Sequence, residues 1–169
     1  MTRMLLALAI ATSFANGQAI DFETLPDGTV TPDEFEISDQ YEADFGVRFD
    51  LVDPVTLEPI GLPRIAKVGS PQTAFEGCGP DTPLEDQGAG LSMLTDDGSI
   101  SNNAGTLLVT YTDPVAQAAG VVIDVDRRGN GTYEEWTIDA LDASMTLLES
   151  QVVTAPMGED VCRTNYGPG

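Results

Sequence analysis

The chain has 169 residues, of which 28 are Asp or Glu and seven are Lys or Arg, and its formal net charge is −21 at pH 7. This length predicts one domain, and the charge excludes recognition of nucleic acid or of anionic membranes through phosphate contacts. The absence of histidine excludes Ser-His-Asp and Cys-His catalysis and histidine metal sites. Divalent cations are the expected counter-ions of such a polyanion, although acidic surfaces also serve solubility alone.

Residues 1–19 have the pattern of a secretory signal peptide. A basic residue precedes the apolar run Met4–Ala11, and small residues stand at the −3 and −1 positions before Ile20. The apolar run is about half as long as the roughly 20 residues that a membrane anchor needs. The sequence therefore predicts cleavage before Ile20, with Asn16 as the alternative first residue, and a secreted, periplasmic or extracellular protein without a membrane span.

Short segments with alternating apolar and polar residues predict the strands of the N-terminal half. The turn at 25–29 contains proline and glycine in their usual positions. The stretch from Asp53 to Asn103 is dense in proline, glycine and acidic residues, which is typical of a long binding loop. The predicted strands are Ile20–Glu23, 46–51, 64–68 and 91–94.

The C-terminal half contains the clearest strand pattern, because period-two segments alternate there with recognisable turns. Trp136 alternates with Ile138 and Ala140, which assigns it to the core. Asp142–Ser144 is the predicted turn of the last hairpin. The predicted strands are 107–111, 121–125, 136–140 and 145–153. Because alternating strands need a second layer and no segment has a sustained helical period, the predicted class is all-β, an antiparallel β-sandwich.

Several of these segments together resemble bacterial secreted β-sandwich domains of the kind often found with PEP-type C-terminal sorting signals. The segments that carry the resemblance are Asp21–Glu23, Pro26–Thr29, Gly46–Phe49, Tyr111–Val115, Gly120–Asp124 and Trp136–Ala140. The resemblance implies that residues 20–169 form a jelly-roll-like, galactose-binding-like sandwich. The chain shows no sorting signal and no closing strand after the last hairpin, so a C-terminally truncated sandwich is the alternative.

The stretch Asp124–Glu135 follows part of the EF-hand calcium loop. Acidic residues stand at positions 1, 3 and 12 and a glycine at position 6, and carboxylate oxygens are the ligands that calcium prefers. Arg128 occupies position 5, where Asp or Asn is usual, and the flanks are predicted strands, so a true EF-hand is not expected. A looser calcium site is predicted, and an acidic hairpin neutralised by its arginines is the alternative. The predicted ligands are Asp124, Asp126, Asn130, Glu134 and Glu135.

A second calcium site is implied by the resemblance alone. Galactose-binding-like modules commonly place a structural calcium ion beside acidic residues of the first strand, and here those residues are Asp21 and Glu23. The two cysteines of the exported chain, Cys78 and Cys162, favour a disulfide over a metal site, because thiols oxidise outside the cytosol. Two free thiols are the alternative.

Carbohydrate chemistry is the remaining candidate activity. Glu134 and Glu135 are adjacent, and adjacent strand residues face opposite ways, so they do not form a hydrolytic pair without a bulge. A Ser-Lys pair would have to use Lys67, and no known spacing surrounds it. Tyr133 and Phe75 are the candidate aromatic platforms for a sugar. The sequence therefore predicts a non-enzymatic, calcium-stabilised binding or structural module with a glycan or another envelope component as partner; the alternative is a secreted carbohydrate-active enzyme.

Overall fold

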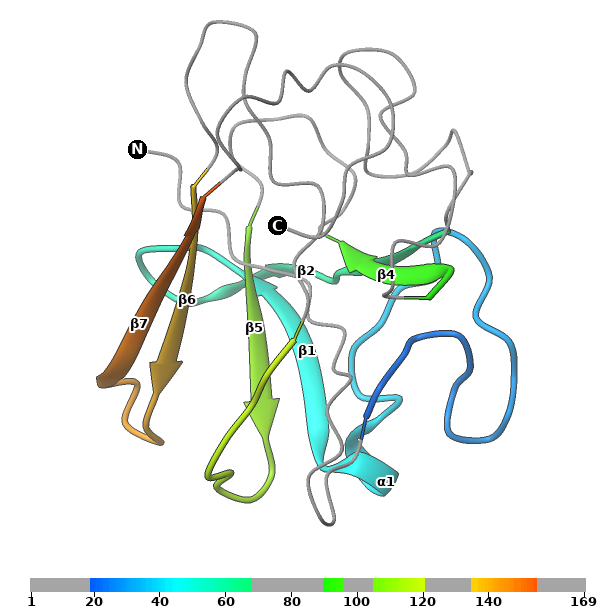
Figure 1. Ribbon diagram of the computed structural model, residues 1–169, viewed down its shortest axis with the longest axis horizontal. Helices are drawn as coiled ribbons and strands as arrows, with labels where there is room; N and C mark the ends of the chain where they lie inside the picture. The colour runs from blue at the N-terminus through cyan, green and yellow to red at the C-terminus, as the bar shows by residue number, and fades with distance from the viewer. Residues whose placement is uncertain (1–18, 68–89, 96–104, 121–134, 155–169) are drawn as a thin grey trace, which may run out of the picture.

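The computed structural model describes residues 19–67, 90–95, 105–120 and 135–154, and the structural statements below concern these residues (Figure 1). They form a mostly β structure with three small antiparallel sheets and a single helical turn. Among them, no helix is long and apolar enough to cross a membrane. The elements are α1 (Glu42–Phe45), β1 (Val47–Val52), β2 (Pro59–Gly61), β3 (Arg64–Lys67), β4 (Ser92–Thr95), β5 (Thr106–Tyr111), β6 (Glu135–Leu141) and β7 (Leu147–Thr154).

The largest sheet has the order β2-β1-β5, with β1 at its centre. β1 pairs with β5 over its whole length, from Val47 opposite Tyr111 to Val52 opposite Thr106. The predicted strand is confirmed, and Val47, Phe49 and Leu51 are buried as expected, although Asp50 and Val52 of the other face are buried too. Burying one apolar side chain of this size contributes about 1.5–3 kcal/mol, so β1 is a main source of the stability of the fold. The short edge strand β2 was not predicted from the sequence.

The second sheet consists of β3 and β4, which confirm the two short strands predicted within the Asp53–Asn103 stretch. They pair in register from Arg64 opposite Thr95 to Lys67 opposite Ser92. Ile65 of β3 and Leu94 of β4 are fully buried. Both belong to the same apolar cluster as the buried face of β1, so the first two sheets share one core.

Aromatic rings fill the centre of this core. Phe22 packs edge-on against Tyr41 and Phe49, with ring centroids 5.9 and 5.5 Å apart. Tyr41, the N-cap residue of α1, and Phe45, its last residue, have ring centroids 5.7 Å apart. The turn was not predicted, because one helical turn is too short to show a helical period. It ends at Gly46, whose φ of 66° is the left-handed conformation that glycine adopts most easily.

The first predicted strand, Ile20–Glu23, is wrong. Its backbone forms no ladder, and the nearest pairing is an isolated bridge between Thr24 and Val30. Phe22 has a φ of 60°, which breaks the extended conformation. The buried Thr31 hydroxyl donates to the carbonyl of Phe22 and holds this bent shape, which turns the Phe22 ring into the core.

The third sheet is the hairpin of β6 and β7, which lies at one margin of the molecule (Figure 1). Its strands and its turn are confirmed: Asp142 accepts the backbone N–H groups of Ser144 and Thr146 at 2.8 and 2.9 Å. Trp136 lies opposite Val153 and is only half-buried, so its assignment to the core is wrong. Its sheet has only two strands, and a two-stranded sheet buries a side chain less completely than a sheet packed against a second layer does.

Candidate functional site

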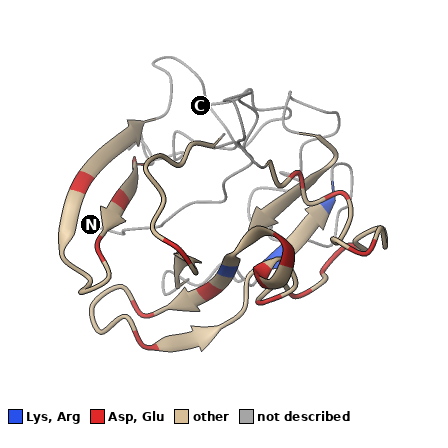
Figure 2. Cartoon of the chain, turned by 90° about the horizontal axis from the view of Figure 1, so that it is seen from below, with Lys and Arg blue, Asp and Glu red and all other residues tan. Residues whose placement is uncertain are grey.

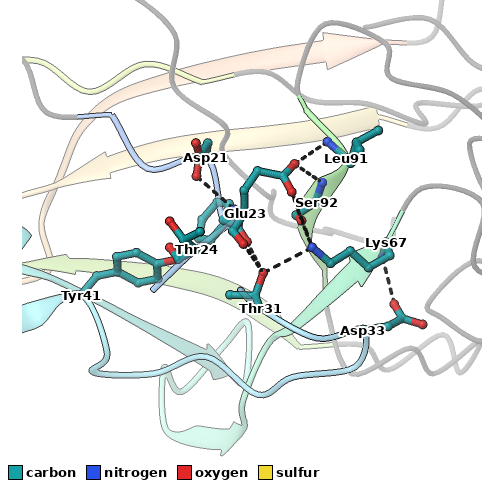
Figure 3. Close-up of polar contacts among 10 residues, drawn as sticks. Asp21, Glu23, Thr24, Thr31, Asp33, Tyr41, Lys67, Leu91 and Ser92 are labelled. Atoms are coloured by element: carbon teal, nitrogen blue, oxygen red, sulfur yellow. Dashed lines mark hydrogen bonds and ion pairs between the residues drawn. The ribbon is translucent and has the colours of Figure 1, made fainter. Parts of the chain in front are cut away.

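The most concentrated polar chemistry in the described part of the chain joins the N-terminal segment to the β3–β4 sheet. It consists of Glu23, Thr31, Lys67 and Ser92, and we call it the Glu23 clamp (Figure 3). Lys67 ends β3 and Ser92 begins β4, and the two residues are direct partners in the sheet. Directly opposed residues of an antiparallel pair present their side chains on the same face, which places the amine beside the hydroxyl.

The Glu23 carboxylate is the acceptor at the centre of the clamp. Its Oε1 accepts the backbone N–H groups of Leu91 and Ser92, the second at 2.8 Å, and its Oε2 accepts the Ser92 hydroxyl at 2.8 Å. The Lys67 ammonium lies 3.5 Å from Oε2. Burial alone would raise the pKa of Glu23, but the hydrogen bonds from Ser92 and Leu91 and the charge of Lys67 lower it below its ordinary value.

The Lys67 side chain connects the carboxylate to the bent N-terminal segment. Its Nζ donates to the Ser92 hydroxyl and to the Thr31 hydroxyl, the latter at 3.5 Å. Thr31 in turn donates to the Phe22 carbonyl. The backbone N–H of Lys67 donates to the Asp33 carboxylate at 2.9 Å, so both ends of this residue are held by the segment that precedes β1.

A serine beside a lysine and a carboxylate suggests nucleophilic catalysis, and the sequence analysis had considered Lys67 for a Ser-Lys pair. The structure does bring Lys67 and Ser92 together. However, Ser92 has no exposed surface, and its hydroxyl proton is donated to Glu23. A nucleophile must reach its substrate, so the clamp fastens two parts of the fold and offers no reacting face.

The predicted calcium residues of the N-terminal segment lie at the clamp. Asp21 is exposed, and its Oδ1 accepts the backbone N–H of Glu23 at 3.0 Å (Figure 3). The Glu23 carboxylate is occupied by the donors of β4 and Lys67. Within the described ranges, no three acidic or thiol side chains are grouped so that they could hold a metal ion. Calcium at these two residues therefore stays a prediction from the resemblance.

Of the other predicted ligands, only Glu135 lies in the described part of the chain. It is the first residue of β6 and is exposed. The remaining predictions fall outside the described residues: the calcium ligands Asp124, Asp126, Asn130 and Glu134, the sugar platforms Tyr133 and Phe75, and the disulfide between Cys78 and Cys162.

The basic side chains show how the charge of the surface is distributed. In the described ranges they are Arg48, Arg64 and Lys67. Each is paired with one acid: Arg48 with Asp50 at 3.0 Å, Arg64 with Glu36 at 3.2 Å, and Lys67 with Glu23. Acidic residues are spread over the loops and strands of the same structure (Figure 2). In the described ranges, every basic side chain is therefore paired, and the acidic residues outnumber the basic ones.

The clamp was missed by the sequence analysis for a specific reason. The contributing residues are spread from position 23 to position 92, and no motif spacing joins them. The one available signal was that the only lysine of the chain directly follows the apolar residues Ile65 and Ala66 of a predicted strand, since a lysine beside a buried strand needs an acidic partner.

Comparisons with known proteins add no functional assignment. Neither a protein-family model, nor a curated protein, nor a solved structure matches the chain.

Proposed function

We propose that the chain is an exported, non-enzymatic binding or structural module of the cell envelope or the extracellular space, stabilised by calcium and able to bind a glycan. Export rests on the signal-peptide pattern of residues 1–19. The structural role rests on how the described residues use their reactive groups.

The observation that carries the non-enzymatic role is the closed state of the Glu23 clamp. Ser92 and Lys67 are the nucleophile and the base that a Ser-Lys hydrolase would use, and both are held in contacts with each other and with Glu23. Because Ser92 is completely buried, these groups support the attachment of the N-terminal segment. Such internal use of polar groups suits a binding or structural module.

Calcium is supported by the charge balance. The chain has 28 acidic residues against seven basic ones, and each of the three basic side chains in the described ranges is paired with an acid. A hard divalent cation relieves the repulsion of closely spaced carboxylates. The Asp124–Glu135 loop remains the proposed site because of its ligand spacing.

A jelly-roll-like sandwich is the architecture that we propose for the module. Its support is the single core that Phe49 and Leu107 of the first sheet share with Ile65 and Leu94 of the second. A sandwich consists of two antiparallel sheets whose inner faces pack against each other around one core. An experimental structure in which these sheets do not pack face to face would overturn this part of the proposal.

Glycan binding is tested with the exported protein on a glycan array in calcium-containing buffer. A parallel screen measures release of reducing ends from soluble polysaccharides. Saturable binding without hydrolysis is the expected result. Hydrolysis that is lost in a Glu134→Gln, Glu135→Gln variant would instead establish the alternative, a secreted carbohydrate-active enzyme. Absence of both binding and hydrolysis would remove the glycan from the proposal.

A further inference from the structure

The β6–β7 hairpin gathers exposed apolar side chains on one element. Leu147, Leu148 and Val152 of β7 are exposed, Leu148 by 68%, and Met145 of the turn is exposed as well. Seven of the eight residues of β7 are exposed. Leu148 and Val152 are four positions apart in a strand and therefore lie on the same face. β7 thus presents an apolar face to solvent.

Among the described residues, one edge of β7 has no partner strand. β7 pairs with β6 along one edge, and in the sheets formed by the described residues no strand pairs with the other. Two views at right angles place β7 at the same outer margin of the molecule (Figures 1 and 2). An unpaired edge offers a row of backbone N–H and C=O groups to which another strand can add.

Beyond the pairing shift at Leu148, this edge has few of the features by which natural sheets protect such edges. Leu147–Thr154 contains no proline, lysine or arginine, and the one shift in its pairing lies beside the turn, between Ala140 and Leu141. Edge strands are usually shortened, bulged or marked with lysine or proline to prevent pairing. The regular part of the edge, from Glu149 to Thr154, is therefore suited to receive a strand.

Charge selects the kind of strand. Residues 135–154 include four acids, namely Glu135, Asp139, Asp142 and Glu149, and no basic residue. A second copy would bring the same acids, together with its own net charge of −21, against this edge. Like charges across a strand pair are unfavourable, whereas lysine or arginine side chains of an added strand would lie opposite or beside carboxylates.

We propose that the free edge of β7 is a docking site for an extended cationic segment of another polypeptide, in which apolar residues alternate with lysine or arginine. The segment adds to β7 as a third strand: its backbone bonds the open edge, its apolar face covers Leu148 and Val152, and its cations meet the hairpin acids. The partner is a polypeptide and the site is a sheet edge, so this site is distinct from the proposed glycan and calcium sites. A glycan array without binding would therefore leave the peptide site untouched.

The first test measures binding of a fluorescent peptide by anisotropy, with the purified chain at about 0.15 M salt. The probe has about ten residues, with valine and lysine alternating, because a β-strand has a period of two. A peptide of the same composition with its lysines in one block tests the alternation, and an alternating valine–glutamate peptide tests the charge. We expect saturable binding of the alternating valine–lysine peptide, with at least about tenfold weaker binding of both controls. Equal binding of the blocked peptide would reduce the interaction to charge attraction and overturn the proposal.

The second test locates the site. Leu148→Lys combined with Val152→Lys places two cations on the β7 face, and Val55→Lys combined with Val115→Lys places two cations at exposed apolar positions outside the hairpin. We expect the first variant to lose peptide binding at least about tenfold and the second to keep it. Equal loss in both variants would overturn the site.

The third test uses the unmodified chain, so that it holds even if a variant misfolds. Hydrogen exchange of the backbone amides in residues 147–154 should slow when the valine–lysine peptide is added, because an added strand bonds the free edge. Unchanged exchange there at saturating peptide would overturn the proposal. Sedimentation would also overturn the proposal if the unmodified chain self-associates and the Leu148→Lys, Val152→Lys variant does not. That result would identify a second copy of the chain as the occupant of the edge.

Discussion

The carboxylate of Glu23 accepts the backbone N–H of Ser92 at 2.8 Å, although 69 residues separate the two in the sequence. The same carboxylate also accepts the Ser92 hydroxyl and lies beside the Lys67 ammonium. One side chain therefore attaches the segment that precedes β1 to the first residue of β4.

Glu23→Gln removes the charge and keeps the shape of the side chain. We expect a loss of about 1–2 kcal/mol in the free energy of unfolding, because hydrogen bonds to a charged acceptor are the stronger ones and Lys67 loses its anion. Urea unfolding measures the loss. Glu58→Gln, at an exposed position before β2, is the matched control and should change stability by less than about 0.5 kcal/mol. Equal stability of the two variants would show that the clamp contributes nothing.

Acid should weaken the clamp selectively. The pKa of Glu23 in the folded chain is lowered from its ordinary value of 4.5, so the stability that it contributes is present above that value and is lost as the pH falls through the lower folded pKa. Thermal unfolding between about pH 5 and pH 3 should therefore depend on pH more steeply in the unmodified chain than in Glu23→Gln. Parallel plots of unfolding temperature against pH for the two chains would contradict this prediction. Protonation of the other acidic residues affects both chains equally, so it does not contribute to the difference.

Gly90 and Gly28 allow a matched test of the space beside the clamp. Both have positive φ, at 92° and 85°. A Cβ atom at Gly90 would lie 2.8 Å from Oε1 of Glu23, whereas one at Gly28 would meet nothing within 4 Å. Gly28→Ala should cost about 1 kcal/mol for backbone strain alone, and Gly90→Ala should cost more because the carboxylate must move. The excess should shrink in a Glu23→Ala background, as a double-mutant cycle would measure.

Alkaline pH should destabilise the fold through Tyr41. Its hydroxyl donates to the carbonyl of Thr24 at 2.8 Å, and burial, with a smaller effect of the Asp21 charge, raises its pKa to about 12. The stability that this group contributes is complete below the ordinary tyrosine pKa of 10.0 and is lost as the pH rises toward about 12. Tyr41→Phe should cost about 0.5–1.5 kcal/mol near neutral pH and should flatten the alkaline decline. Unfolding midpoints that fall equally with pH in both chains would contradict this assignment.

Calcium should raise the thermal stability of the chain through the Asp124–Glu135 loop. A ligand that binds only the native state adds RT ln(1 + [L]/Kd), which for an extracellular site amounts to about 1–3 kcal/mol at millimolar calcium. Sodium at matched ionic strength is the control for general screening. Equal stabilisation by both salts, or an undiminished calcium response in an Asp124→Ala, Asp126→Ala variant, would reduce the loop to an acidic hairpin.

In the described ranges, most strands were predictable from alternation and local turns, while the predicted strand 121–125 lies outside those ranges. β1, β5, β6 and β7 all follow a period-two pattern, and the turn at Asp142 is closed by its own side chain. These features depend on neighbouring residues, so the local sequence contains the information that they need. The same rule failed for Ile20–Glu23, because the Thr31 hydroxyl bends the backbone at Phe22.

The sequence by itself determined the all-β class, the positions of most strands and the acidic balance, because alternation, turn residues and charge are local or additive properties. Only the tertiary structure decided that Lys67 stands opposite Ser92, that Glu23 joins them, and that one face of β7 lies open. Strand register and the partner of a buried ion are set by packing between distant segments. Since many pairings of short alternating strands satisfy the same pattern, the residues of the clamp could be recognised only after the sheets had been assembled.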